Sequence, residues 1–266
     1  ELMDSEVFIC VWKPGTKDRA IEFVKQNVKE VQIRRVSEQV PKMQCVWSGE
    51  GQKGDALKKL IEHPDIDHVY ADTLSTANPI PGRPPLQPPL ENGKSACKPH
   101  DPKFSELWGM QNSRAIQAWC CVQASEVIVA IVDSGVDYRH PDLRDNMWRN
   151  PKEIPGDGKD DDGNKIVDDV FGVDYVDVDP VTLLATGDPL DENYHGTHVA
   201  GTVGAVGNNN EGVAGVCWRV PIIAVRVLDK NGSGYGFDVA DGIRYAIKNG
   251  AKVVNLSLGG QPGQSP

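Results

Sequence analysis

Two histidines stand close together in the stretch NYHGTHVAGTVGAVGNNNEGVAG, which covers residues 193–215. His195 lies at or just before the start of a helix predicted over residues 195–206. The partial positive charge of a helix N-terminus disfavours an imidazolium there, so His195 is expected to stay neutral near pH 7. A neutral imidazole can accept a proton, which makes His195 a candidate general base. His198 lies one turn later. Its structural alternative to a chemical role is that of a buried imidazole that makes a hydrogen bond.

The sequence VIVAIVD, residues 127–133, ends an apolar, β-branched run in a carboxylate. Such a run is typical of a strand buried on both faces. In parallel sheets the active site forms at the carboxyl ends of the strands, which is where Asp133 would lie. Asp133, Ser134 and Gly135 could equally form an ordinary turn.

A zinc hydrolase is an alternative use of the two histidines. The helical zinc motif of metalloproteases places its histidines four residues apart, with a glutamate between them. His195 and His198 are three residues apart with no acidic residue between them, and their flanks are glycine and alanine. The spacing therefore argues against zinc.

Three apolar runs, at residues 127–133, 220–227 and 252–258, alternate with helical patterns at 195–206 and 238–250. This alternation predicts an α/β fold with a doubly wound, mainly parallel sheet. Upstream, residues 7–72 show the order β-α-β-β-α-β, which is typical of a small ferredoxin-like α+β domain. Dense prolines separate the two patterns. We therefore predict a domain at 5–78, a Pro-rich linker at 79–103 and a second domain at 104–266.

The composition excludes some partners. The formal net charge is −10, so a nucleic-acid-binding face is not expected. No apolar run is long enough to span a bilayer. The cysteines number 6, which is an even count but too sparse for a disulfide scaffold, and their pairing is left open.

Four segments together resemble the subtilisin-like serine proteases: VAIVDSGVDYRHPDL, HGTHVAGTVGAV with GVAGV, VRVLDKNGSGYGFDVADGIRYAIKNGAKVVNLSLGG, and HDPKFSELWGMQNSRAIQAW. The resemblance runs from about residue 99 to 260, and the N-terminal domain resembles the family's inhibitory propeptide less strongly. It implies acyl transfer by an Asp-His-Ser triad in which Asp133 is the carboxylate and His195 the base. In that pattern His198 is part of the scaffold.

The resemblance also implies a peptide-binding groove between two backbone segments, which would hold an extended substrate as a β-ladder. The corresponding residues are Gly232, Ser233, Gly234, Ser257, Leu258 and Gly259. The family's nucleophile lies in a G-T-S-x-[AS] segment that does not occur in these 266 residues, and its oxyanion-hole asparagine also lies beyond SLGG. The catalytic domain is thus expected to be present only in its N-terminal part, and this chain to be inactive alone.

Structural Ca²⁺ is the predicted cofactor, since several hard oxygen ligands match a strong calcium site of thermitase-like members. The predicted ligands are Asp101, Asp142, Val206, Asn209, Glu211 and Val213. A loop held by ordinary hydrogen bonds is the alternative. Asp174 and Asp179 match a second, weaker calcium site of the family. Asp160, Asp162, Asn164 and Asp168 have the alternate spacing of a calcium loop, or form a solvated acidic loop.

The expected function is a secreted or vesicular endopeptidase zymogen that acts on polypeptides and is inhibited by its own propeptide. Two alternatives remain: a truncated, non-catalytic protein whose propeptide-like domain inhibits another protease, and the zinc hydrolase.

Overall fold

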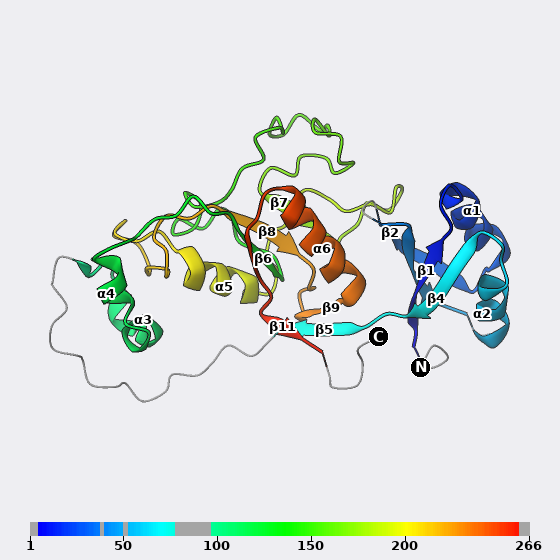
Figure 1. The fold of residues 1–266 in the computed structure, drawn as a ribbon, viewed down its shortest axis with the longest axis horizontal. Helices are drawn as coiled ribbons and strands as arrows, with labels where there is room; N and C mark the ends of the chain where they lie inside the picture. The colour runs from blue at the N-terminus through cyan, green and yellow to red at the C-terminus, as the bar shows by residue number, and fades with distance from the viewer. Residues whose placement is uncertain (1–4, 38–39, 50–52, 78–96, 261–266) are drawn as a thin grey trace.

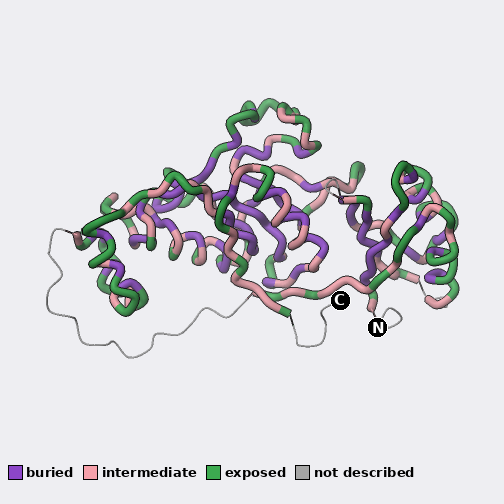
Figure 2. Tube along the Cα trace, in the orientation of Figure 1, coloured by how far each residue is buried: buried purple, intermediate pink, exposed green. Residues whose placement is uncertain are grey.

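The computed structural model describes residues 5–37, 40–49, 53–77 and 97–260, arranged as two units (Figure 1). Residues 79–96 of the predicted linker lie outside the described residues. Within the described residues, no helix is both long enough and apolar enough to cross a bilayer. Figure 2 shows buried residues in both units.

The N-terminal unit is a four-stranded antiparallel sheet with the strand order β2-β3-β1-β4. Its elements are β1 Val7–Trp12, α1 Lys17–Asn27, β2 Val31–Val36, β3 Lys42–Trp47, α2 Lys53–Ile61 and β4 Ile66–Ala71. The order along the chain is the one expected from the sequence. Ala20 and Val24 of α1 are buried four residues apart, and they join a core that also takes Leu57 and Leu60 from α2.

The second unit contains a parallel sheet with the order β10-β6-β8-β7. The strands are β6 Val129–Asp133, β7 Gly172–Asp174, β8 Ile222–Arg226 and β10 Val253–Asn255. Four of the five residues of β6 and all five of β8 are buried, which explains why these strands have continuous apolar sequences.

Helices cover both faces of this sheet. Ala130 and Val132 of β6 share a core with Tyr245 of α6 (Gly236–Lys248), whereas Ile131 shares a core with Ala200 of α5 (His195–Gly204). Because successive side chains of a strand point to opposite faces, the two helices lie on opposite sides of β6. This is the doubly wound arrangement of an α/β fold, as predicted (Figure 1).

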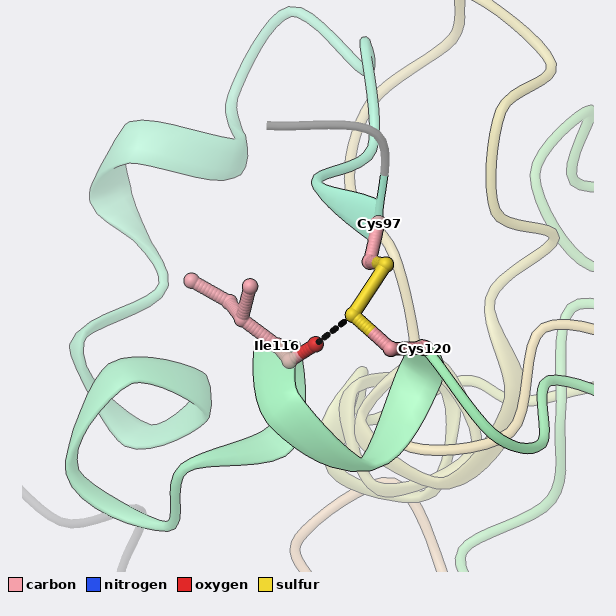
Figure 3. Close-up of a disulfide and its surroundings, with 3 residues drawn as sticks. All are labelled: Cys97, Ile116 and Cys120. Atoms are coloured by element: carbon pink, nitrogen blue, oxygen red, sulfur yellow. Dashed lines mark hydrogen bonds between the residues drawn. A yellow bond between two sulfur atoms is a disulfide. The ribbon is translucent and has the colours of Figure 1, made fainter. Parts of the chain in front are cut away.

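The chain from Cys97 onward packs on the second unit. It forms the short 3-10 helix η2 Phe104–Glu106 and the helices α3 Trp108–Asn112 and α4 Ala115–Trp119. Cys97 and Cys120 form a disulfide, and Figure 3 shows Cys120 Sγ against the carbonyl oxygen of Ile116. Residues 97–103 fall within the linker predicted at 79–103. Of these, His100 donates its N–H to Oδ1 of Asn208, and Lys103 donates its N–H to the carbonyl oxygen of Gly212.

A small sheet connects the two units. It has the order β11-β5-β9, with β5 Leu74–Ala77, β9 Ser233–Tyr235 and β11 Leu258–Gly259. The strand β5 follows the N-terminal unit directly, yet both of its partners come from the second unit, as Figure 1 shows.

Candidate active site

Asp133 and His195 meet at the carboxyl edge of the parallel sheet. Asp133 is the last residue of β6, and His195 is the first residue of α5. Nδ1 of His195 lies 2.7 Å from Oδ1 of Asp133. Asp133 is fully buried and His195 is 5% exposed. Two residues that are 62 positions apart in the chain thus form one hydrogen-bonded pair.

Burial has the largest effect on the pKa of Asp133. It raises the pKa of Asp133, while hydrogen bonds from His195 and from the backbone N–H of Ser134 act in the opposite direction. Within the described residues, Oδ2 of Asp133 has no hydrogen-bond partner. A carboxylate at this distance can accept a hydrogen bond from Nδ1 of the imidazole and so orient the ring.

Asp191 holds the first turn of α5 in place. Its Oδ2 accepts hydrogen bonds from the backbone N–H and from Oγ1 of Thr197, at 2.9 and 2.6 Å. Its Oδ1 accepts one from Oγ of Ser134, and that hydroxyl in turn accepts the N–H of Gly196. Asp191 therefore connects the strand that carries Asp133 to the helix that carries His195. We did not single it out from the sequence; its position just before a predicted helix start was the available signal.

His198 has a different environment from the one considered in the sequence analysis. It is exposed on α5, whereas His195 is buried, so the two imidazoles have different surroundings. Among the described residues, the group of side chains close enough to share a metal ion consists of carboxylates elsewhere and includes neither histidine.

The predicted groove residues flank β5. Ser75 pairs with Gly234 and Thr76 with Ser233, and the backbone N–H of Ala77 donates to the carbonyl oxygen of Gly232 at 2.8 Å. On the other side, Leu258 pairs with Ala77 and Gly259 with Thr76. Ser257 precedes β11, and its hydroxyl donates to Oδ1 of Asn255. An extended segment of this chain therefore lies between the two backbone segments predicted to bind a peptide.

The residues of the first predicted calcium site come together through hydrogen bonds. Asp101 and Asp142 are both buried. Asp101 accepts the N–H groups of Asn208 and Asn209, at 2.8 and 3.1 Å. Asp142 accepts the Asn209 side-chain amide and the N–H of Val213, both at 2.8 Å.

The other members of that set belong to the same loop. The N–H of Val206 donates to the carbonyl oxygen of Asp142, and that of Glu211 donates to Oδ1 of Asn209. All four carboxylate oxygens of Asp101 and Asp142 thus accept N–H groups, which is the hydrogen-bonded loop given as the alternative to a calcium site.

Asp174 and Asp179 each have other partners. Asp174 is buried, and its Oδ2 lies 3.0 Å from the guanidinium of Arg226, which also contacts Asp177 and Glu192. Burial raises the pKa of Asp174 to about 6, against the effect of Arg226. Asp179 accepts three hydrogen bonds from Val181 and Thr182. Asp174 thus pairs with an arginine, whereas the sequence predicted that it would bind a calcium ion.

The third candidate cation site includes Glu153, which lies outside the predicted loop. Glu153, Asp160 and Asp162 place carboxylate oxygens within 4.8 Å of one another, close enough to hold a metal ion. Glu153 is 7% exposed, and its Oε2 has no hydrogen-bond partner among the described residues. Burial raises its pKa, and the nearby Asp162 adds to the effect.

Asn164 and Asp168, which were predicted as calcium ligands, form hydrogen bonds with other residues of the protein. The side-chain amide of Asn164 donates to Asp169, and Asp168 accepts the N–H groups of Gly156 and Gly158.

The sequence of this chain is similar to those of known proteins. Residues 124–266 match the family model of the subtilases. Thermitase from Thermoactinomyces vulgaris is 42% identical over 168 residues, which is 63% of this chain and 50% of that protein. Subtilisin-like protease 1 from Plasmodium falciparum is 40% identical over 155 residues, which is 57% of this chain and 22% of that protein.

A solved structure is similar over almost the whole chain. Fervidolysin from Fervidobacterium pennivorans, a keratinolytic enzyme related to subtilisin, superimposes with a TM-score of 0.58. The match covers 98% of this chain and 37% of fervidolysin at 22% identity, which supports the fold.

A parallel sheet with an aspartate and a histidine paired at its carboxyl edge is an arrangement compatible with a hydrolase that uses an Asp-His pair. The chain belongs to the subtilase family of serine peptidases. It spans between about a fifth and a half of the length of the relatives described above.

Proposed function

We propose that this chain is the N-terminal part of a subtilisin-like serine endopeptidase precursor. The contact of 2.7 Å between Asp133 and His195 carries the proposal. In this mechanism His195 takes the proton of a serine hydroxyl that attacks the peptide carbonyl, and Asp133 orients the imidazole and stabilises its charge. The sequence of 266 residues contains no G-T-S-x-[AS] nucleophile segment, so we propose that the chain is inactive alone.

The N-terminal unit acts, in this proposal, as an inhibitory propeptide with a ferredoxin-like fold. Its strand order and its β-α-β-β-α-β sequence support that fold. Pairing of β5 with both β9 and β11 supports the inhibition, because β5 fills the space where the backbone of a substrate would form a ladder. Cleavage to release the unit would follow β5, on the C-terminal side of Ala77.

Calcium is the proposed structural cofactor at two places. The first is the loop where Asp101, Asp142 and Asn209 converge. The second is the group of Glu153, Asp160 and Asp162, where a cation would satisfy the orphaned buried oxygen of Glu153. A bound ion would neutralise these carboxylates and hold their loops in place.

A secretory compartment is the proposed location. The disulfide between Cys97 and Cys120 supports it, since such bonds persist in oxidising environments.

The test compares two proteins: the chain described above and the protein translated from the complete transcript. We expect the complete protein to hydrolyse fluorescein-labelled casein and the shorter chain to show no hydrolysis. Substituting His195→Ala in the complete protein should lower kcat by about 10⁴-fold or more. Hydrolysis by the shorter chain, or an active His195→Ala protein, would contradict the proposal. A stop codon directly after Pro266 would favour a non-catalytic protein.

A further inference from the structure

Arg35 of β2 is the most deeply buried cation at the contact between the two units. It is 1% exposed, although it lies in a strand of the small N-terminal unit. Its Nε donates to Oδ1 of Asp238 at 2.7 Å, and its Nη2 donates to Oδ2 of Asp241 at 2.9 Å. Both aspartates are fully buried, and both come from α6 of the second unit (Figure 1).

Two aromatic rings complete the surroundings of this guanidinium. The Cζ atom of Arg35 lies 4.4 Å from the ring centroid of Tyr175 and 4.4 Å from that of Phe237. Contact between a guanidinium and an aromatic face is favourable, and more so away from water. Asp238 and Asp241 are three residues apart on one helix, so they share a face and offer two separate acceptors to one planar donor.

Neighbouring cations lie at the edge of this pocket. Nη1 of Arg34 is 2.9 Å from Oδ2 of Asp238, and its guanidinium lies over the ring of Tyr235. Nζ of Lys42 lies 4.2 Å from the centroid of Phe237, and burial lowers its pKa. These groups surround the pocket, but the side chain that enters it and bonds to both aspartates is Arg35.

The chemistry selects for a guanidinium. A planar fork can donate from Nε and Nη2 to two carboxylates at once while it contacts two aromatic rings. An ammonium is a compact point charge that cannot match both acceptors and both rings. If the pocket lost Arg35, both buried carboxylates would lose a partner, and Asp241 would keep only the partly exposed Arg244 of the same helix at 3.3 Å. Removing one partner from a buried charge is costly.

We propose that Asp238, Asp241, Tyr175 and Phe237 form a guanidinium-binding site on the second unit, separate from the groove that holds β5. Arg35 fills it in the precursor. Once the N-terminal unit has left, the site is open to an arginine side chain of another polypeptide. The inference rests on the proposed function only for that departure; the selectivity of the pocket requires no catalysis.

The experiment replaces the missing side chain by a small molecule. Arg35→Ala in the full chain removes the atoms that ethylguanidinium contains. We expect millimolar ethylguanidinium, at constant ionic strength, to raise the Tm of this variant and to restore slow hydrogen exchange in α6. Ethylammonium should bind about ten times more weakly, because it lacks the fork. Arg19→Ala, which removes an exposed arginine paired with Asp65, is the matched control and should not respond.

Further variants keep the proposal falsifiable. Combining Arg35→Ala with Asp241→Asn should abolish the response to ethylguanidinium. Equal rescue by the two cations, or rescue that survives Asp241→Asn, overturns the proposal. If Arg35→Ala does not fold, Arg35→Lys retains the charge and should still speed amide exchange at the start of α6, and unchanged exchange would refute the inference. None of these outcomes depends on peptidase activity, so they are distinguishable from failure of the proposed function.

Discussion

Gly196 packs directly against the backbone of Gly135. A Cβ atom built on Gly196 would come within 2.0 Å of the carbonyl oxygen of Gly135 and within 3.2 Å of Cβ of Asp133. The first turn of α5 therefore touches the chain where it leaves β6. This close approach is what lets the imidazole of His195 reach Asp133.

Substituting Gly196→Ala should separate the first turn of α5 from the backbone of Gly135. The added methyl group must push α5 away from the strand, which we expect to cost about 1–3 kcal/mol of unfolding free energy. It should also remove the low-field NMR signal of the His195 Nδ1 proton. Gly201→Ala is the matched control, because Gly201 lies in the same helix and a methyl group there would meet no other described segment of the chain within 4 Å. An unchanged proton signal in the Gly196→Ala protein would show that the approach is not required.

Asp133→Asn tests the tautomer of His195. An amide can present its NH₂ group where the carboxylate accepted a hydrogen bond, so the imidazole is no longer held with its proton on Nδ1. We expect ¹⁵N NMR to show a shift of the protonated nitrogen from Nδ1 toward Nε2, and the complete enzyme to lose about 10⁴-fold in kcat. The same tautomer in both proteins would mean that Asp133 does not orient the ring.

Glu153→Gln tests the cation site outside the predicted loop. We expect the apparent affinity of this site for Tb³⁺, measured by luminescence titration, to fall roughly tenfold, because one charged ligand is lost. Asp145→Asn removes an exposed carboxylate outside the Glu153, Asp160 and Asp162 group and should leave Tb³⁺ binding unchanged. Equal binding by wild type and Glu153→Gln would exclude Glu153 as a ligand.

Asp72 gives the junction between the units a defined pH dependence. Its Oδ2 accepts a hydrogen bond from Gln44 at 2.5 Å, and its Oδ1 accepts the N–H of Phe237 at 3.2 Å. Burial raises its pKa above the ordinary 3.8, and these hydrogen bonds only partly oppose the effect. The folded state thus takes up a proton at a higher pH than the unfolded state does.

The sign of the effect follows from linkage. As the pH falls from neutrality through the raised pKa toward 3.8, the wild type should gain unfolding free energy relative to Asp72→Asn, and the gain should level off below 3.8. Urea unfolding of both proteins between pH 7 and pH 4 measures this difference. A difference that stays constant over that range would contradict the assignment to Asp72.

Local patterns in the sequence were sufficient to predict the strands β1–β4, β6, β8 and β10 and the helices α1, α2, α5 and α6. Alternating apolar runs and helical spacings predicted both units, because those patterns reflect which faces are buried. The rule that parallel strands carry their active sites at the carboxyl edge placed Asp133. Its pairing with His195 was implied by the resemblance to the subtilisin-like serine proteases, and the two side chains lie 2.7 Å apart.

Contacts between distant segments were not predictable in this way. The strand β5 has four residues, and its partners lie more than 150 positions away, so no local periodicity marks it. Glu153 stands outside the alternate spacing of the acidic loop. Arg35 looked like one polar residue of an ordinary strand, and only the packing of α6 against β2 shows that it is buried.

The disulfide between Cys97 and Cys120 lies wholly on the C-terminal side of β5. A single cut between Ala77 and Cys97 would therefore leave no covalent link between the N-terminal unit and the rest of the protein. Rebinding of that unit would change from an intramolecular step to an intermolecular one, and the high effective concentration of a tethered partner would be lost. Dilution after the cut, such as release from a crowded vesicle, would then be enough to favour separation without any change in the contacts themselves.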